Sequence, residues 1–205
     1  MVLYGALKLV AVALMRLGFR LEVEGREHVP ASGPVLLVSN HVSLLDPPVV
    51  GGAAPRDLYF LAKEELFAIP LFGRLIRALN ARPVKRDGSD SRALKMALRL
   101  LAEGRALLVF PEGTRGVEGR LREGRPGAGM LAVMSGAPVV PVYVSGSGRA
   151  LPPGHAIPRP RKVRVRFGPP LHFKWGTDEG RKERYREATQ ELMRAIAQLR
   201  DRETS

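Results

Sequence analysis

Short apolar runs rich in β-branched residues alternate with amphipathic segments along most of the 205-residue chain. A buried strand is typically an apolar run of about four to eight residues, whereas a helix repeats its apolar positions every three or four residues. The alternation predicts a single layered α/β domain in which helices flank a mixed, largely parallel sheet. We expect strands at 34–40, 57–62, 82–85, 105–111, 137–145 and 162–168, and helices at 71–79, 89–104, 127–136 and 179–202. The last of these strands alternates charged with apolar residues, which indicates an edge or half-exposed strand.

The first 20 residues are strongly apolar but are interrupted by Lys8 and Arg16. A membrane span needs about 20 apolar residues, so we do not expect a transmembrane helix. The pattern favours a helix that lies in the membrane interface, with its few cations reaching the lipid phosphates. The alternative is a core helix of a soluble domain. We therefore divide the chain into an apolar membrane-interface helix (1–20) that precedes one folded domain (21–205).

The net charge and the absence of cysteine limit which partners and which cellular compartment we expect for the protein. A formal net charge of +13 favours polyanionic partners such as an acidic membrane surface, a phosphorylated substrate or nucleic acid. Arginine outnumbers lysine by more than three to one, which suits phosphate contacts, although a biased genome composition gives the same ratio. The chain has no cysteine, which excludes thiol nucleophiles and disulfides and fits a reducing compartment. We expect the protein at the cytoplasmic face of the cell membrane.

The stretch "VSNHVSLLDPP" sets His41 five residues before Asp46, a spacing that suits one face of neither a helix nor a strand. The two side chains therefore meet only if the backbone turns between them. The alternative for Asp46 is a structural role as the N-cap of a helix that starts at Pro47. Because Pro48 has no N–H, Val49 is the one amide left for that cap, and the carboxylate keeps lone pairs for an imidazole. We interpret the pair as a general base and its orienting carboxylate; the alternative is a structural histidine.

The stretch "FPEGTR" is a second candidate site, at the end of a predicted strand. Pro111 ends the strand, and Gly113 permits a left-handed backbone conformation. Glu112 and Arg115 project from the resulting turn. An arginine beside open backbone amides suits a phosphate, whereas the alternative is a surface turn with a local Glu–Arg ion pair.

Further cations surround these two stretches, and several familiar motifs are missing. Arg82, Lys85 and Arg86 bracket a short predicted strand, and Arg122 and Arg125 lie in a Gly/Pro-rich loop. The chain has no G-x-S-x-G elbow, no phosphate-binding P-loop, no dinucleotide fingerprint and no clear metal-ligand spacing. It also lacks a basic platform interleaved with aromatic residues for nucleic acid bases. What remains is a His–Asp base without an obvious covalent nucleophile, beside several arginines suited to phosphate.

"NHVSLLDP" resembles the Asn-His-x4-Asp-Pro motif of the glycerolipid acyltransferases, in particular the bacterial 1-acylglycerol-3-phosphate acyltransferases. "PVKRDG", "FPEGTR" and "APVVPVYVSG" are similar to the second, third and fourth motifs of that family. The four stretches occur in the family's order, within residues 34–146. The chain departs from the family after the third motif, where Arg125-Pro126-Gly127 stands in place of a Lys before a Gly.

The resemblance implies an enzyme that moves a fatty acyl group from a thioester to the free hydroxyl of 1-acylglycerol-3-phosphate and so makes phosphatidic acid. His41 would be the general base and Asp46 would orient it, with backbone amides near Gly113 as candidate oxyanion donors. Arg86 and Arg115 would hold the phosphate, and Glu112 would fix Arg115 or a glycerol oxygen. The implied substrate-binding residues are Arg86, Glu112, Gly113, Thr114, Arg115 and Arg125.

The implied partners are lysophosphatidic acid, acyl-CoA or acyl carrier protein as the donor substrate, and a membrane surface. No cofactor, no metal and no nucleic acid are expected. Two alternatives stay open: the same chemistry on another lysolipid acceptor, and a non-catalytic module that binds anionic lipid.

Overall fold

The computed structural model describes residues 18–84, 91–155, 157–174 and 180–202. Most of the predicted interface helix (1–20) and the predicted phosphate ligand Arg86 lie outside these residues. The strands are β1 (Glu22–Glu24), β2 (Val35–Ser39), β3 (Leu58–Lys63), β4 (Ala81–Val84), β5 (Ala106–Val109), β6 (Val139–Ser145) and β7 (Arg164–Phe167). The α-helices are α2 (Asp46–Ala53), α3 (Phe72–Ala78), α4 (Ser91–Ala102), α5 (Pro126–Ser135), α6 (Ser147–Ala150) and α7 (Arg181–Asp201), with 3₁₀ turns η1 (Arg26–His28) and η2 (Glu64–Ala68).

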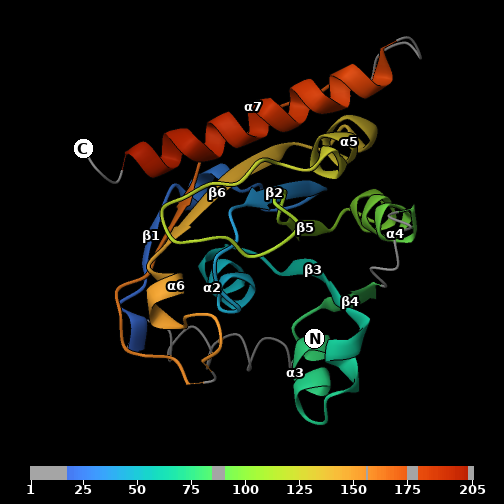
Figure 1. Ribbon diagram of the computed structural model, residues 1–205. Helices are drawn as coiled ribbons and strands as arrows, with labels where there is room; N and C mark the ends of the chain where they lie inside the picture. Colours follow the sequence, from blue (N-terminus) through green and yellow to red (C-terminus); the bar gives the residue numbers. More distant parts are fainter. Residues whose placement is uncertain (1–17, 85–90, 156, 175–179, 203–205) are drawn as a thin grey trace.

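The described strands form one sheet in the order β1-β7-β6-β2-β5-β3-β4 (Figure 1). Neighbouring strands are parallel except for β6 and β7, which run antiparallel. The predicted α/β domain with a mixed, largely parallel sheet is therefore confirmed. Each strand and helix predicted within residues 21–205 has a counterpart whose ends lie within a few residues of the expected ones.

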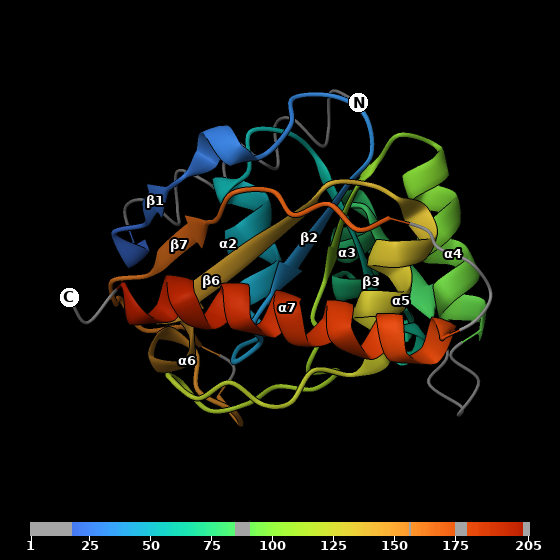
Figure 2. The same ribbon diagram turned by 90° about the horizontal axis from the view of Figure 1, so that it is seen from above.

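Strand β2 lies at the centre of the sheet and is buried along its whole length. Its side chains alternate between the two faces, as in any strand. Val35 and Leu37 pack in the cluster that contains α2, whereas Leu36 and Val38 pack in the cluster that contains α4, α5 and α7. Figure 2 shows α7 running across the sheet over β6 and β2. The sheet is thus covered on both faces, which explains the near-continuous apolar sequence of its central strand.

Strand β7 was predicted to be an edge or half-exposed strand. It is half-exposed, with Val165 and Phe167 buried and the two arginines only partly buried, but it is not at the edge, because the short strand β1 pairs with its outer side. The charged positions of β7 find partners there: Arg164 Nε lies 2.7 Å from Glu22 Oε2, and Arg166 Nε lies 2.8 Å from Glu24 Oε2. The hydrogen bond from Lys162, with that from Arg164, lowers the pKa of Glu22 below its ordinary value. The alternating charges of β7 therefore mark a strand that carries cross-strand ion pairs.

Candidate active site

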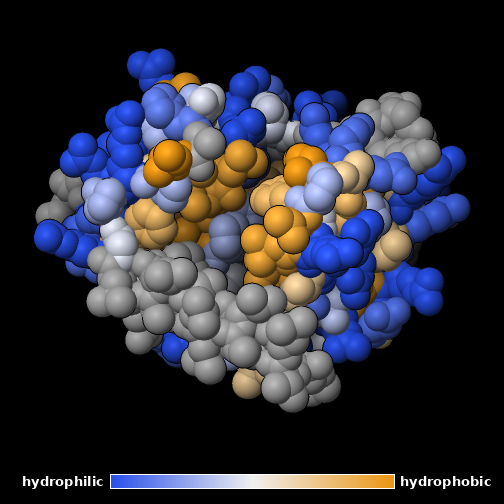
Figure 3. Space-filling view, turned by 90° about the horizontal axis from the view of Figure 1, so that it is seen from below, coloured by the Kyte–Doolittle hydropathy of each residue, from blue (hydrophilic) through white to orange (hydrophobic). Residues whose placement is uncertain are grey.

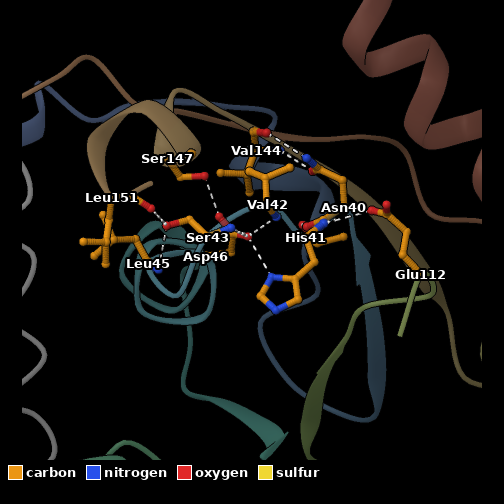
Figure 4. Close-up of polar contacts among 12 residues, drawn as sticks. Asn40, His41, Val42, Ser43, Leu45, Asp46, Glu112, Val144, Ser147 and Leu151 are labelled. Carbon is orange, nitrogen blue, oxygen red and sulfur yellow. Dashed lines mark hydrogen bonds and ion pairs between the residues drawn. The ribbon is translucent and has the colours of Figure 1, made fainter. Parts of the chain in front are cut away.

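The carboxyl ends of β2, β5 and β6 meet at one edge of the sheet, because these three strands are parallel. The segments that follow these strands therefore lie close together: one begins near His41, one begins near Phe110, and the third is the short helix α6. Ligand sites of α/β domains form at such edges. Figure 4 shows the polar contacts that join these segments around His41 and Asp46.

The predicted contact between His41 and Asp46 is present. His41 Nδ1 lies 2.8 Å from Asp46 Oδ2, and the side chains are 17% and 0% exposed, respectively. The imidazole stacks on the ring of Phe110, with ring centroids 4.1 Å apart and an angle of 21° between the planes. The far nitrogen, Nε2, points away from Asp46 (Figure 4). One face of the ring and one nitrogen are thus fixed, while the ring remains accessible from outside.

Asp46 is held by backbone amides as well as by the imidazole. Its Oδ2 accepts hydrogen bonds from the N–H groups of Val42 at 2.7 Å and Ser43 at 2.8 Å. Its Oδ1 accepts the hydroxyl of Ser147 at 2.5 Å. A fully buried carboxylate therefore has donors on both oxygens, which offsets the cost of removing its charge from water.

Helix α2 starts at Asp46, with Leu45 at the cap position, so Asp46 does not take the alternative role of capping a helix that begins at Pro47. The amide of Val49, expected as the one local donor to the carboxylate, donates instead to the carbonyl of Leu45 at 2.9 Å. The side chain of Asp46 turns backward, toward the loop that carries His41. The absence of N–H groups at both prolines leaves the carboxylate free for this role.

Glu112 has a different partner from the one expected. Its Oε1 accepts the backbone N–H of His41 at 3.0 Å, and its Oε2 accepts the backbone N–H of Arg122 at 3.1 Å. The side chain is 3% exposed, and among the described residues it forms no ion pair with Arg115. The backbone carbonyl of His41 in turn accepts the N–H of Gly116 at 2.7 Å. Glu112 thus fixes the main chain of the histidine to the loop after β5.

Asn40 joins β2 to β6 beyond the end of the regular pairing. Its side chain donates to the carbonyl of Val144 at 2.9 Å and accepts the N–H of the same residue at 2.7 Å. The carboxamide thereby takes the place of a peptide group in the ladder between the two strands. This contact fixes the residue immediately before His41 to the neighbouring strand β6.

Glu118 anchors the same loop to helix α6. Its Oε1 accepts the N–H of Gly146 at 2.6 Å, and its Oε2 accepts the N–H of Gly148 at 2.9 Å. Ser147, which donates to Asp46, lies between these two glycines. The carboxylate of Glu118 therefore sets the position of the hydroxyl that reaches the buried Asp46.

The remaining predicted ligands lie on the outer side of the loop after β5. Gly113 has the expected positive φ of 69°, and the side chain of Arg125 lies directly against it, where an added Cβ would be 2.6 Å from Nε. Thr114 and Arg115 are exposed, as is Arg125. The structure thus brings Arg125 to the Gly113 turn and leaves Arg115 and Arg125 exposed in the segment after β5 that Glu112 joins to His41, whereas Arg86 falls outside the described residues.

Sequence reasoning did not assign roles to Phe110, Glu118 or Ser147. Ser147 follows the predicted strand 137–145, and the rule that parallel strands end at one edge was a usable signal for it. Glu118 carried no such signal, since its partners are amides whose position depends on the path of two loops. Within the ranges described here, no group of histidine and acidic side chains is arranged to hold a metal ion. Nor is any described helix long and apolar enough to cross a bilayer.

The chain has a mixed, mostly parallel sheet with a buried aspartate and its hydrogen-bonded histidine at the strand ends. Comparison with known sequences identifies the family to which it belongs. The family described as Acyltransferase matches residues 20–145, more than half of the 205 residues, and the chain belongs to this family.

Three of the known proteins that match the chain illustrate the similarity. It is 34% identical over 158 residues to the chloroplastic 1-acyl-sn-glycerol-3-phosphate acyltransferase LPAT1 of Arabidopsis thaliana, covering 75% of this chain and 44% of the relative. It is 29% identical over 182 residues to the 1-acyl-sn-glycerol-3-phosphate acyltransferase of Bacillus subtilis, covering 88% of each. The crystal structure of the acyltransferase PlsC from Thermotoga maritima superposes with a TM-score of 0.77 at 30% identity, over 96% of this chain and 79% of that one. The chain spans less than half the length of the Arabidopsis relative.

Proposed function

We propose that the protein transfers a fatty acyl group from an acyl thioester to the free hydroxyl of 1-acylglycerol-3-phosphate, which gives phosphatidic acid. The observation that carries the proposal is the pair of His41 and Asp46, with Nδ1 held at 2.8 Å and Nε2 directed away. The printed activity of the Arabidopsis and Bacillus relatives, 1-acyl-sn-glycerol-3-phosphate acyltransferase, supports the choice of acceptor.

The arrangement suits direct transfer with His41 as general base. The Nε2 atom takes the proton of the acceptor hydroxyl as its oxygen attacks the thioester carbonyl carbon. The positive charge that the ring gains is stabilised by the carboxylate of Asp46, which also keeps Nδ1 protonated and the ring oriented. Collapse of the tetrahedral intermediate breaks the C–S bond, and the departing thiolate takes the proton from Nε2. A base of this kind contributes about 10²–10⁴-fold to the rate.

The exposed cations beside the site suit the phosphate of the acceptor. Arg115 and Arg125 lie on the loop after β5, next to the segment that Glu112 fixes to His41. A guanidinium matches two phosphate oxygens at once, which orients the acceptor as well as attracting it. Arg86 completes the proposed phosphate ligands, because it lies in the stretch that resembles the family's second motif.

Backbone amides near Gly113 stay the proposed source of oxyanion stabilisation, but two amides of this turn have other partners. The N–H of Gly113 donates to the carbonyl of Phe110 at 3.0 Å, and that of Gly116 donates to His41. Both amides are therefore committed to the turn. The oxyanion donors are to be sought among the other amides of this loop, such as those of Thr114 and Arg115.

The donor is proposed to be acyl-CoA or acyl carrier protein, used as a substrate, with no other cofactor. The acceptor resides in a bilayer, so the protein is proposed to work at the membrane surface. An interfacial helix in the first 20 residues and the cytoplasmic face of the cell membrane remain our predictions for how it is held there.

The test is a thiol-release assay with purified full-length protein and a matrix of donors and acceptors. We expect thiol release from acyl-CoA or acyl carrier protein that depends on added lysophosphatidate. His41→Ala should lower kcat by about 10²–10⁴-fold while the protein stays folded, although loss of the contacts to Phe110 and Asp46 lowers the melting temperature. The exposed His155→Ala is the matched control and should retain full activity.

Each other outcome points to a different conclusion. Full activity in the His41 variant would refute the base assignment. Turnover with a different lysolipid but not with lysophosphatidate would keep the chemistry and change the acceptor. Binding to anionic vesicles without turnover of any donor would favour the non-catalytic module.

A further inference from the structure

The segment between β3 and β4 leaves a group of large apolar side chains in solvent. Leu71 is 77% exposed, and three neighbours are also exposed: Ile69, Phe72 and Leu75. Helix α3 already buries its inner side, where Gly73 packs against the backbone of Phe67 and Ile76 joins the same cluster. The outer side of the helix therefore exposes Phe72 and Leu75, which have no partner among the described residues. Large apolar side chains that gather on a protein surface mark a site of contact with another protein or a membrane.

The backbone at the most exposed of these residues is unusual. Leu71 has φ 61° and ψ −50°, and the N–H of Phe72 donates to the carbonyl of Pro70 at 2.7 Å. This is a γ-turn of the form with positive φ, which is rare and unfavourable for a residue with a side chain. Such conformations persist where the surrounding structure enforces them, and they gather at sites with a function. Here the turn holds a leucine outward, away from the core.

Cations flank the apolar group on the same helix. Arg74 and Arg77 are both exposed, and the guanidinium of Arg77 lies 5.1 Å from the ring centroid of Phe67. The two acidic residues of the segment, Glu64 and Glu65, stand at the beginning of η2, before the apolar group. Apolar side chains bordered by arginines are suited to an anionic lipid surface, since the apolar groups enter the acyl region and the arginines reach the phosphates.

The segment lies at the same edge of the sheet as His41. Strand β3 is parallel to β5, and β5 is parallel to β2, so η2 leaves β3 at the edge where His41 leaves β2. The sheet order sets the two exits two strand spacings apart, about 10 Å. Figure 3 shows apolar side chains gathered around a hollow on the face of the molecule where Figure 1 places α2 and α3. A bilayer that meets α3 therefore faces the edge that carries the site.

We propose that residues 69–75 form a membrane-docking surface that inserts Leu71 and its apolar neighbours into a bilayer of anionic phospholipid. The proposal rests on the proposed function for its purpose, because a lipid acceptor must reach His41 from the bilayer. It adds a contact made by the folded domain itself, separate from the predicted helix in the first 20 residues. The net charge of +13 supports the choice of an anionic surface.

The natural absence of cysteine permits a site-specific test on the full chain. Leu71→Cys is labelled with a fluorophore whose emission shifts to the blue in an apolar environment, and Gln190→Cys, exposed on α7 at the opposite side, is the matched control. With phosphatidylglycerol vesicles we expect a blue shift at position 71 and quenching by brominated acyl chains. With phosphatidylcholine vesicles the shift should be weaker, and at position 190 neither vesicle should change the emission. An unchanged probe at position 71 on vesicles that bind the protein would overturn the proposal.

Two other occupants of the surface give different signals, and either would also overturn the proposal. If another part of the chain covers it, the probe at position 71 is shielded in buffer without lipid. If a second copy covers it, the shift in buffer depends on protein concentration.

A charge substitution separates docking from catalysis. Leu71→Glu should weaken binding to phosphatidylglycerol vesicles about tenfold or more, whereas Gln190→Glu adds the same charge with little effect. Turnover of a short-chain lysophosphatidate in solution should be unchanged in both variants. If the probe enters the bilayer but no acceptor is acylated, the proposed function fails and docking stands. If acylation proceeds and Leu71→Glu binds vesicles like the parent protein, docking fails and the function stands.

Discussion

The substitution Glu112→Gln tests whether this carboxylate supports the site or binds substrate. Both oxygens of Glu112 accept backbone N–H groups, from His41 at 3.0 Å and from Arg122 at 3.1 Å. Glutamine has the same shape, but one oxygen becomes an NH₂ group that faces an N–H donor. The variant therefore keeps one bond, without its charge, and leaves a buried donor unsatisfied.

The magnitude follows from these two bonds. A hydrogen bond to a charged group contributes about 1.5–3 kcal/mol, and an unsatisfied buried group costs about 1–3 kcal/mol. Because the side chain is 3% exposed, water does not replace the lost partner, and we expect a destabilisation of about 2–4 kcal/mol. For a domain of this size, that corresponds to a fall in Tm of about 5–15 °C. Since the bond to His41 positions the base, kcat should fall more than KM rises.

Scanning calorimetry and the thiol-release assay together measure both effects. Glu123→Gln, at an exposed position of the same loop, removes the same charge and should change neither Tm nor kcat appreciably. The reasoning is refuted if Glu112→Gln melts within about 1 °C of the parent protein while KM for the acceptor rises, because that result assigns the carboxylate to substrate.

Two further substitutions test contacts at the site and at the edge of the sheet. Ser147→Ala removes the hydroxyl that donates to Asp46 at 2.5 Å, so kcat should fall about tenfold or more at nearly constant KM, and Ser147→Thr should retain more activity. The pKa of Glu22 is lowered by its hydrogen bonds to Lys162 and Arg164, so its contribution to stability is present at neutral pH and is lost as pH falls through the lowered pKa. Titration by NMR should place that pKa closer to 4.5 in Lys162→Gln; an identical value in both proteins would contradict the assignment.

The layered fold was predictable because its signals are local and repeated. Apolar runs such as 34–40 and 137–145 predict buried strands, and because these strands are parallel their carboxyl ends lie at the same edge of the sheet. Strand β1 was not predicted, because three residues in which two glutamates flank one valine are too short a pattern to indicate a strand. When β1 is not recognised, the sequence of β7 resembles an edge strand. Its arginines in fact form ion pairs with the glutamates of β1.

The contact between His41 and Asp46 was predictable because the two prolines after Asp46 withhold the amides of an ordinary helix cap. The partners of Glu112 were not predictable, since an acidic residue beside Arg115 suggests a local ion pair. Whether Glu112 pairs with Arg115 or accepts backbone N–H groups depends on how far the loop folds back over the end of β2. That path is a property of the whole domain, and no short stretch of sequence encodes it.

Ser147 is separated from Asp46 by 101 positions, which orders events while the protein is made. The ribosome adds about 5–20 residues each second, so the hydroxyl becomes available roughly 5–20 s after the carboxylate has been synthesised. Nascent chains that end before α6 lack this donor and the glycine amides that hold Glu118. The set of hydrogen bonds to Asp46 is therefore completed only after β6 and α6 have been synthesised.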